Sequence, residues 1–300
     1  MTSAVNIGIS PITPFNEEPY ITVQEYRNSP SSLDYDNLVV GGNAAAQEAE
    51  LNNVILRASS FLDEYLNQNL NASTQTETQR TRFQQNGFIA LHPNQNPIIS
   101  LDEFSYGAVP GQLTPLTDLS STWFEEQQVI IPTSNLTLTW SSQGPLSFGG
   151  MGSYAGGQIY CQYKYTSGYV NNKIVTAVAG DSELVCNPTG IVAGNSLRIY
   201  DGARSETVIV DSSYTYGDVT IPLVTPLLYD HAAGITLGNM PYAIKQATML
   251  VTNAFIKVRG DSSLTMNITT QPSTNIGNDQ RFGKDVALAL EMVNLYRRIR

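Results

Sequence analysis

The sequence has few charged residues, few cysteines and histidines, and no long hydrophobic run. Asp, Glu, Lys and Arg make up 14% of its 300 residues, well below the usual share in globular proteins. No window approaches the roughly 18 apolar residues of a membrane-spanning helix, so we expect no membrane partner. Residues 1–20 lack the charged start and apolar run of a secretory signal. We therefore expect a chain made and folded in a cytoplasm.

Cys161 and Cys186 are the only cysteines, and their spacing fits neither a disulfide framework nor a zinc site. We expect two buried thiols. The only histidines, His92 and His231, lie beside turn residues, and no nucleophile motif such as Gly-x-Ser-x-Gly accompanies them. Asp230 precedes His231, but neighbours on a turn rarely point at each other, so we expect no catalytic dyad.

Other features that can indicate catalysis or ligand binding have simpler explanations. Adjacent carboxylates occur at Glu17-Glu18, Asp63-Glu64, Asp102-Glu103 and Glu125-Glu126. A glycosidase needs two carboxylates on opposite sides of a cleft, whereas a solvated sheet face accounts for these pairs. The glycine-rich segment 149–157 lacks the Gly-Lys-Ser/Thr of a phosphate loop. With no EF-hand or Cys/His cluster either, we expect no enzymatic activity, no cofactor and no metal ion.

Asn, Gln, Ser, Thr and Tyr take the place of the missing charges, while the apolar content of 41% still supports a folded core. The formal charge of −10 argues against a protein that grips nucleic acid through its phosphates. Residues 281–300, however, carry five cations and two carboxylates, a net charge of +3, which leaves −13 for the rest. A basic tail on an acidic body predicts that the tail meets something other than its own body surface.

Three segments have the hydrophobic period of a helix. In 241–260, apolar residues recur along one face, Pro241 suits the first turn and Gly260 suits the position after the last. Residues 44–69 match this pattern, with Asn43 as N-cap. We expect the apolar faces of these two helices to pack against each other. A last helix is predicted over 283–296, and its terminal arginines are favoured by the helix dipole.

The rest of the chain has the pattern of strands and turns. From 74 to 168 the hydrophobic period is two, with short apolar runs between Gly, Pro and Asn, which predicts antiparallel sheet. Residues 173–239 contain six further short strand candidates, with a turn at Asp201-Gly202, and predict a small β-barrel or sandwich. Residues 1–20 are predicted to form an extended arm, and 261–279 a polar loop.

These elements predict an α+β fold, in which a small helical bundle is interrupted by antiparallel β insertions. The helical core comprises residues 1–72 and 240–300. The insertions are an antiparallel β region, 73–170, and a small β-barrel or sandwich, 171–239.

Four motifs also occur in a characteristic order. They are the Ile-Thr-Val-Gln-Glu-Tyr of 21–26 with the helix of 50–65, the Pro-Ile-Ile-Ser-Leu-Asp of 97–102, the Tyr-x-x-x-x-Gly-Tyr of 163–169, and the Pro-x-x-Ile-Lys-x-Ala of 241–247, followed by the helix ending Leu-Tyr-Arg-Arg. This ordered set resembles the head–tail connector (adaptor) proteins of tailed bacteriophages. It covers about a third of the chain. Family members are often much shorter, so 102–158 and 173–239 look like additions.

The resemblance implies a structural virion protein, assembled in the host cytoplasm, that forms a dodecameric ring at the phage neck. Such a ring binds the portal protein, offers a platform to a downstream neck or tail protein, and extends the channel through which DNA passes without specific binding. The family's C-terminal segment commonly docks into the portal. Here this implies portal-binding roles for Lys284, Val286, Leu290, Val293, Tyr296, Arg297, Arg298 and Arg300.

Two alternatives remain open on the sequence. One is a different ring component of the tail, such as a tube, stopper or terminator protein, although those are usually mostly β. The other is a carbohydrate-binding surface protein that uses the aromatic β region around Trp123 and Trp140.

Overall fold

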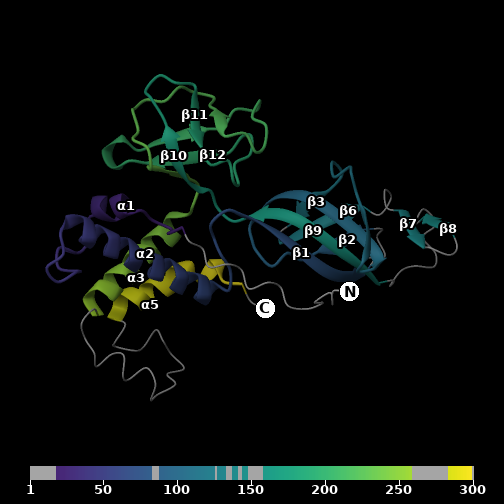
Figure 1. Ribbon diagram of the computed structural model, residues 1–300, viewed down its shortest axis with the longest axis horizontal. Coiled ribbons are helices and arrows are strands. Elements are labelled where there is room, and N and C mark those ends of the chain that lie inside the picture. The colour runs from purple at the N-terminus through teal and green to yellow at the C-terminus, as the bar shows by residue number, and fades with distance from the viewer. Residues whose placement is uncertain are drawn as a thin grey trace, which may run out of the picture. The chain divides into compact units, whose positions relative to one another are not determined.

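The computed structural model describes residues 18–82, 88–125, 127–132, 137–140, 144–147, 158–258 and 283–298. The predicted α+β class with antiparallel β insertions is confirmed (Figure 1). The chain divides into two compact units, one built around Ala72–Gly168 and one that combines Phe15–Asn71 with Tyr169–Arg300. The predicted arm up to residue 17, the glycine-rich segment 149–157 and the polar loop 261–279 lie outside the described residues.

The second unit contains the helices α1 (Val23–Asn28), α2 (Ala44–Leu66), α3 (Tyr242–Val258) and α5 (Gly283–Val293), and a 3₁₀ turn, η4 (Asn294–Tyr296). Thr22 and Glu25 form a capping box that starts α1. Asn43 caps α2 as predicted, because its side chain accepts from the Ala46 N–H at 2.9 Å. Asn67 ends α2 in the left-handed conformation, with φ of 56°.

Helix α3 packs against α2 as predicted, and α5 lies beside them (Figure 1). Their shared core contains Ala58, Leu62, Leu66, Ile244, Ala247, Val251, Ala254, Val286, Ala289, Leu290 and Val293. The polar residues Thr248 and Thr252 of α3 are also fully buried, and each hydroxyl donates to the carbonyl four residues earlier. Helix α3 is therefore the central helix of the bundle.

The first unit is built from antiparallel sheets. One has the order β1-β9-β3-β4, the second β2-β6-β5, and β7 pairs with β8. Their bounds are β1 Ser73–Arg82, β2 Phe88–Leu91, β3 Ile98–Val109, β4 Gln112–Pro115, β5 Trp123–Glu125, β6 Gln128–Pro132, β7 Thr137–Trp140, β8 Gly144–Ser147 and β9 Gln158–Ser167. Apolar side chains of β2, β3, β6 and β9 form one core, which includes the buried thiol of Cys161.

The second unit also contains all six strands predicted between 173 and 239. They are β10 Asn171–Thr176, β11 Glu183–Cys186, β12 Ser196–Tyr200, β13 Glu206–Ile209, β14 Thr220–Pro222 and β15 Thr236–Gly238, in the order β13-β12-β15-β10-β11-β14. The outermost strands meet just beyond β13 and β14, where the Asp211 N–H donates to the Pro222 carbonyl and the Val224 N–H to the Ile209 carbonyl, both at 2.9 Å. The sheet thus curls around a core of its own, as a small barrel does.

Candidate functional site

Helix α5, predicted as a docking peg, belongs to the core of the second unit. Val286, Leu290 and Val293 are 1%, 7% and 0% exposed, and Tyr296 is partly buried against the same cluster. This corrects the prediction that these apolar side chains face a portal protein. The apolar face of an amphipathic helix predicts that this face is buried, but it does not tell what covers it. Here it is covered by α2 and α3 of the same chain.

The basic C-terminal end lies against the last turn of α2. The Arg298 N–H donates to the Leu66 carbonyl at 3.0 Å, and the Arg297 guanidinium lies 5.0 Å from the centroid of the Tyr65 ring. The Arg297 cation is favoured there, because the C-terminal end of a helix carries a partial negative charge and an aromatic ring attracts a cation. Arg297 and Arg298 therefore meet the protein's own surface, which corrects the opposite prediction, and Arg300 lies outside the described residues.

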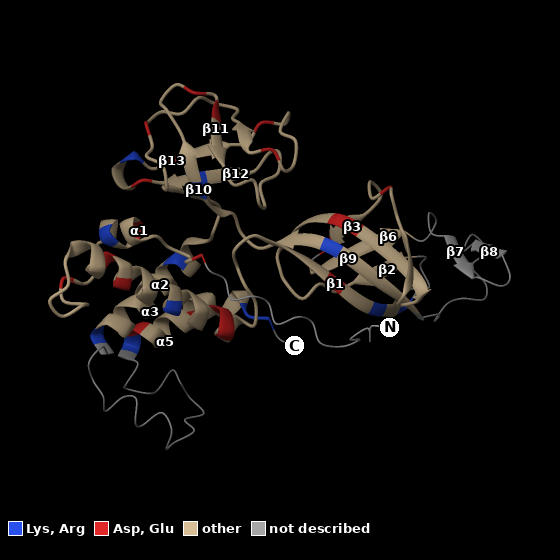
Figure 2. Ribbon diagram, viewed as in Figure 1, with Lys and Arg blue, Asp and Glu red and all other residues tan. Residues whose placement is uncertain are grey.

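The solvent side of α5 and η4 carries different residues. Lys284 is exposed, Leu288 is 50% exposed and Leu295 is 92% exposed. Their spacings of four and seven residues place them along one side of a helix. Figure 2 shows basic residues where the end of α3 meets the start of α5, and there Lys257 pairs with Asp285 at 2.6 Å. Leu288 and Leu295 are therefore apolar side chains of this part of the chain that remain open to solvent.

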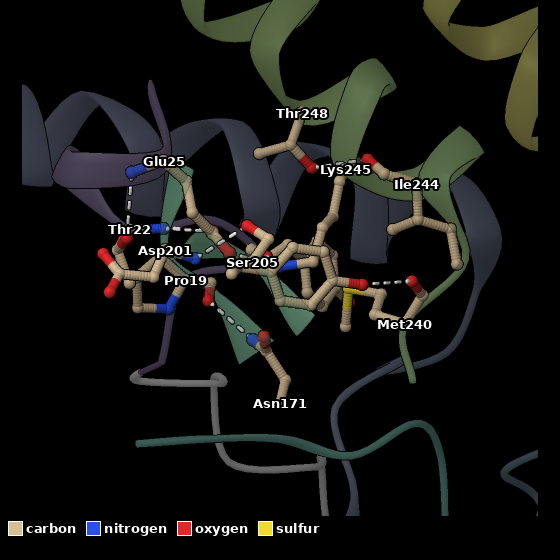
Figure 3. Close-up of polar contacts among 12 residues, drawn as sticks. Pro19, Thr22, Glu25, Asn171, Asp201, Ser205, Met240, Ile244, Lys245 and Thr248 are labelled. Carbon is tan, nitrogen blue, oxygen red and sulfur yellow. Dashed lines mark hydrogen bonds and ion pairs between the residues drawn. The ribbon is translucent and has the colours of Figure 1, made fainter. Parts of the chain in front are cut away.

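A buried lysine joins three elements of the second unit (Figure 3). Lys245, in the first turn of α3, is 4% exposed. Its ammonium donates to Glu25 Oε1 of α1 at 2.8 Å and to the Tyr20 carbonyl at 3.3 Å. The same ammonium lies 4.0 Å from the centroid of the Tyr200 ring at the end of β12. One side chain thus links α1, α3 and the six-stranded sheet.

Further contacts tie the six-stranded sheet to the helices at the same place. The Tyr200 hydroxyl donates to the Met240 carbonyl at 3.4 Å, and its ring packs edge-on against Tyr242. The Asn171 side chain donates to the Pro19 carbonyl at 3.0 Å. The junction is therefore held by specific polar and aromatic contacts in addition to chain connectivity.

The chemistry of this junction suits a structural cross-link. Burial lowers the pKa of Lys245 below its ordinary value, while the charge and hydrogen bonding of Glu25 act in the other direction. The two side chains are 5% and 7% exposed. An ammonium that is enclosed and paired in this way lacks the free electron pair and the access that a nucleophilic lysine needs. The Pro-x-x-Ile-Lys-x-Ala pattern drew attention to Lys245 but gave no sign of its partners.

A second polar cluster lies in the six-stranded module. The His231 side chain is fully buried, with Nδ1 3.0 Å from Asp201 Oδ2 and Nε2 2.9 Å from Glu206 Oε1. Asp230 does not face its neighbour, as expected, and accepts instead from the Ala179 N–H at 2.8 Å. Sequence reasoning missed the pairing of His231. A signal was present in β13, where Glu206 shares the inward face with Val208. A carboxylate on that face needs a buried polar partner.

Asp63 of α2 is a third ionisable group with polar partners inside the unit, and it is half-buried. It accepts a hydrogen bond from the Tyr20 hydroxyl, which in turn accepts from the Leu70 N–H. Burial raises the pKa of Asp63 to about 8 from an ordinary 3.8. The bond from Tyr20 favours the charged carboxylate and opposes this shift.

Asp63→Asn should therefore remove a pH dependence of stability. A folded-state pKa above the unfolded one means that the folded protein holds the proton more tightly. Stability is then fully present below about pH 4 and falls as the pH rises towards about 8. The difference between pKa values of 3.8 and about 8 corresponds to about 6 kcal/mol. Because Asp63 is only half-buried and bonded by Tyr20, we expect the wild type to lose about 2 kcal/mol across this range. The variant should lose less, as measured by urea unfolding at a series of pH values.

The neighbouring exposed residue provides the control for this prediction. Glu64→Gln removes a carboxylate from the same turn of α2, at a position open to solvent. It should leave the pH profile unchanged. An identical response of both variants would contradict the assignment to Asp63.

The carboxylates considered for a glycosidase are held by different partners. Asp102 accepts from the Thr166 hydroxyl at 3.2 Å, whereas Glu103 pairs with Lys164 at 3.1 Å. Trp123, considered for sugar stacking, is 39% exposed. In the described ranges, no group of three His, Cys, Asp or Glu side chains could hold a metal ion. None of the helices described is long and apolar enough to cross a membrane.

Comparison of the chain with protein-family models, with curated proteins and with solved structures found no match.

Proposed function

We propose that this protein is a non-enzymatic structural component of a tailed-phage virion, a ring at the neck that joins the portal to the next neck or tail protein. The observation that supports it best is the helical domain, in which α2 from the first part of the chain packs with α3 and α5 from the last part. This matches the order of motifs that resembles the connector family. The β modules lie between these parts as insertions, and they supply surface for the downstream partner.

The charge of the protein supports a conduit for DNA. With a formal net charge of −10, a ring of such subunits repels the phosphate backbone, so DNA slides through it without specific binding. The ring is proposed to contain twelve copies and to belong to the virion neck after assembly in the host cytoplasm.

The portal contact is proposed to use the solvent side of the C-terminal helix. Val286, Leu290 and Val293 are buried within the subunit, so the available side chains are Leu288 and Leu295, with Lys284 as a flanking cation. A small apolar contact suffices when the copies of a ring bind together, because their affinities reinforce one another.

The proposal is tested with the purified protein and its cognate portal. We expect negative-stain images of rings that stack on the portal ring. Leu295→Glu should abolish stacking while the circular dichroism spectrum stays unchanged, whereas Val40→Glu, at another fully exposed apolar position of the same unit, should leave stacking intact. A protein that forms no rings with or without portal would overturn the function. Rings that bind portal despite Leu295→Glu would overturn only the contact surface.

A further inference from the structure

The hydrogen bonds around His231 depend on how many protons its imidazole ring carries. Both ring nitrogens face carboxylate oxygens, which only accept hydrogen bonds when ionised. Glu206 also accepts from the Leu228 and Tyr229 N–H groups, at 3.0 and 3.1 Å. Burial alone raises the pKa of Glu206, but these backbone bonds and His231 hold it below its ordinary value. Glu206 therefore stays ionised, and Nε2 must carry a proton.

The bond to Asp201 then depends on the charge of the imidazole. In the imidazolium form Nδ1 carries the second proton and donates to the Asp201 carboxylate. In the neutral form the proton on Nε2 remains with Glu206, so Nδ1 has a lone pair that faces a carboxylate. Two acceptors cannot bond, and their approach is repulsive. Histidine is the side chain that ordinarily changes charge between about pH 5 and pH 8.

Other charged groups near His231 do not replace these partners. Asp230, next in the chain, is bonded to the Ala179 N–H, and Arg198 of β12 lies over the Tyr242 ring. Arg204 and Lys173 are exposed. Asp201 has a 17% exposed side chain, whereas that of Glu206 is 6% exposed. Asp201 is therefore the partner that water can solvate when its bond is lost.

Asp201 begins the turn that touches the first helix. Its N–H donates to the Ser205 hydroxyl at 3.0 Å, which closes the 201–205 turn around η2 (Gly202–Arg204) and is drawn in Figure 3. Gly202 lies against Asn28, the last residue of α1, so closely that an added Cβ would come within 3.2 Å of the Asn28 side-chain nitrogen. Tyr200, the preceding aromatic residue, covers Lys245. The orientation of this turn is thus linked to the junction with the helices.

We propose that Asp201, His231 and Glu206 form a pH-sensitive latch that holds the 201–205 turn against α1. Protonated His231 bonds both carboxylates and keeps the turn closed. When His231 loses its proton, Asp201 is released to solvent, the turn loosens, and the contact of the six-stranded module with α1 weakens. The module is then free to change its orientation on the helices. This inference is independent of the proposed phage function.

Hydrogen–deuterium exchange of the full-length protein tests the latch. The two pH values are chosen by NMR, one at which the His231 ring is protonated on both nitrogens and a higher one at which it is neutral. After correction for the intrinsic pH dependence of exchange, the peptides covering 201–205 and 23–28 should lose protection between them. We expect a change of about tenfold or more, as for loss of one hydrogen bond to a charged group. Equal protection at both pH values would overturn the proposal.

Asp201→Asn gives the sharpest comparison. An asparagine amide can donate to the bare Nδ1 of neutral His231 and, after a flip, accept from the imidazolium. This variant should stay protected at both pH values, while Asp218→Asn, at an exposed carboxylate of the same module, should behave like the wild type. Retention of the wild-type pH dependence in Asp201→Asn would contradict the latch.

A measurement on the unmodified protein covers the case in which the variant does not fold. Nitrogen NMR over a pH series should show both His231 ring nitrogens protonated at the lower pH of the exchange experiment and one bare at the higher pH. His92, the other histidine of the chain, provides an internal reference. A His231 ring that keeps one state throughout would also overturn the proposal.

Discussion

Replacing Leu290 with Ala should destabilise the helical part of the second unit by about 2–5 kcal/mol, the range for a buried leucine in a core that cannot fully collapse. Leu290 is 7% exposed and packs with α2 and α3 residues. The measurement is urea unfolding followed by far-ultraviolet circular dichroism, which reports mainly on the helices. Tryptophan fluorescence should show little change, because Trp123 and Trp140 both belong to the first unit.

Leu288→Ala is the matched control on the same helix. Leu288 is 50% exposed, so its truncation should change stability by no more than about 0.5 kcal/mol. A similar small effect of both substitutions would show that α5 is not part of the core in solution. The apolar face of α5 would then be free to bind a partner, as the sequence had predicted. Deletion of 283–298 should likewise unfold the bundle, since it removes four core side chains.

Breaking the buried pair of Lys245 and Glu25 should have an effect of similar size. Removal of one partner leaves the other charge buried and uncompensated, which costs about 3–5 kcal/mol. We therefore expect Lys245→Met and Glu25→Gln each to destabilise the second unit strongly. The double variant should be much more stable than the sum of the two changes predicts, because it buries no unpaired charge. Urea unfolding of all four proteins gives this coupling energy.

An exposed ion pair in the same unit serves as the reference for this cycle. Lys257 and Asp285 are 54% and 34% exposed and join the ends of α3 and α5. Their coupling should be no more than about 1 kcal/mol. Additive effects at Lys245 and Glu25 would mean that the two charges do not interact in solution.

The elements of the fold could be predicted from local patterns, but their partners could only be predicted in part. The spacing of Ile244, Ala247 and Val251 identified α3 as an amphipathic helix. Because α2 has an apolar face of similar length and pattern, the packing of the two helices could also be predicted. The same kind of stripe in α5 led to the wrong partner. A period of 3.6 residues specifies a buried face and carries no information on whether the covering surface is internal or belongs to another molecule.

The polar clusters were less predictable because they join residues far apart in the sequence. His231 is 25 and 30 residues from its two carboxylates, and Lys245 is 220 residues from Glu25. Pairings of this kind depend on strand order and on where turns end, and no local propensity encodes them. Only the inward position of Glu206 in β13 hinted that a charge had to be satisfied inside.

The helical domain also sets the order in which the protein can fold. The Tyr26 hydroxyl of α1 donates to the Asn253 side chain of α3, 227 residues later. Contacts across such a separation form slowly, whereas both β modules have cores of their own and fold from nearer neighbours. During synthesis the apolar face of α2 therefore stays without its main partner until α3, residues 242–258, has been made. A chain that stops before α3 leaves that apolar face exposed and prone to aggregation.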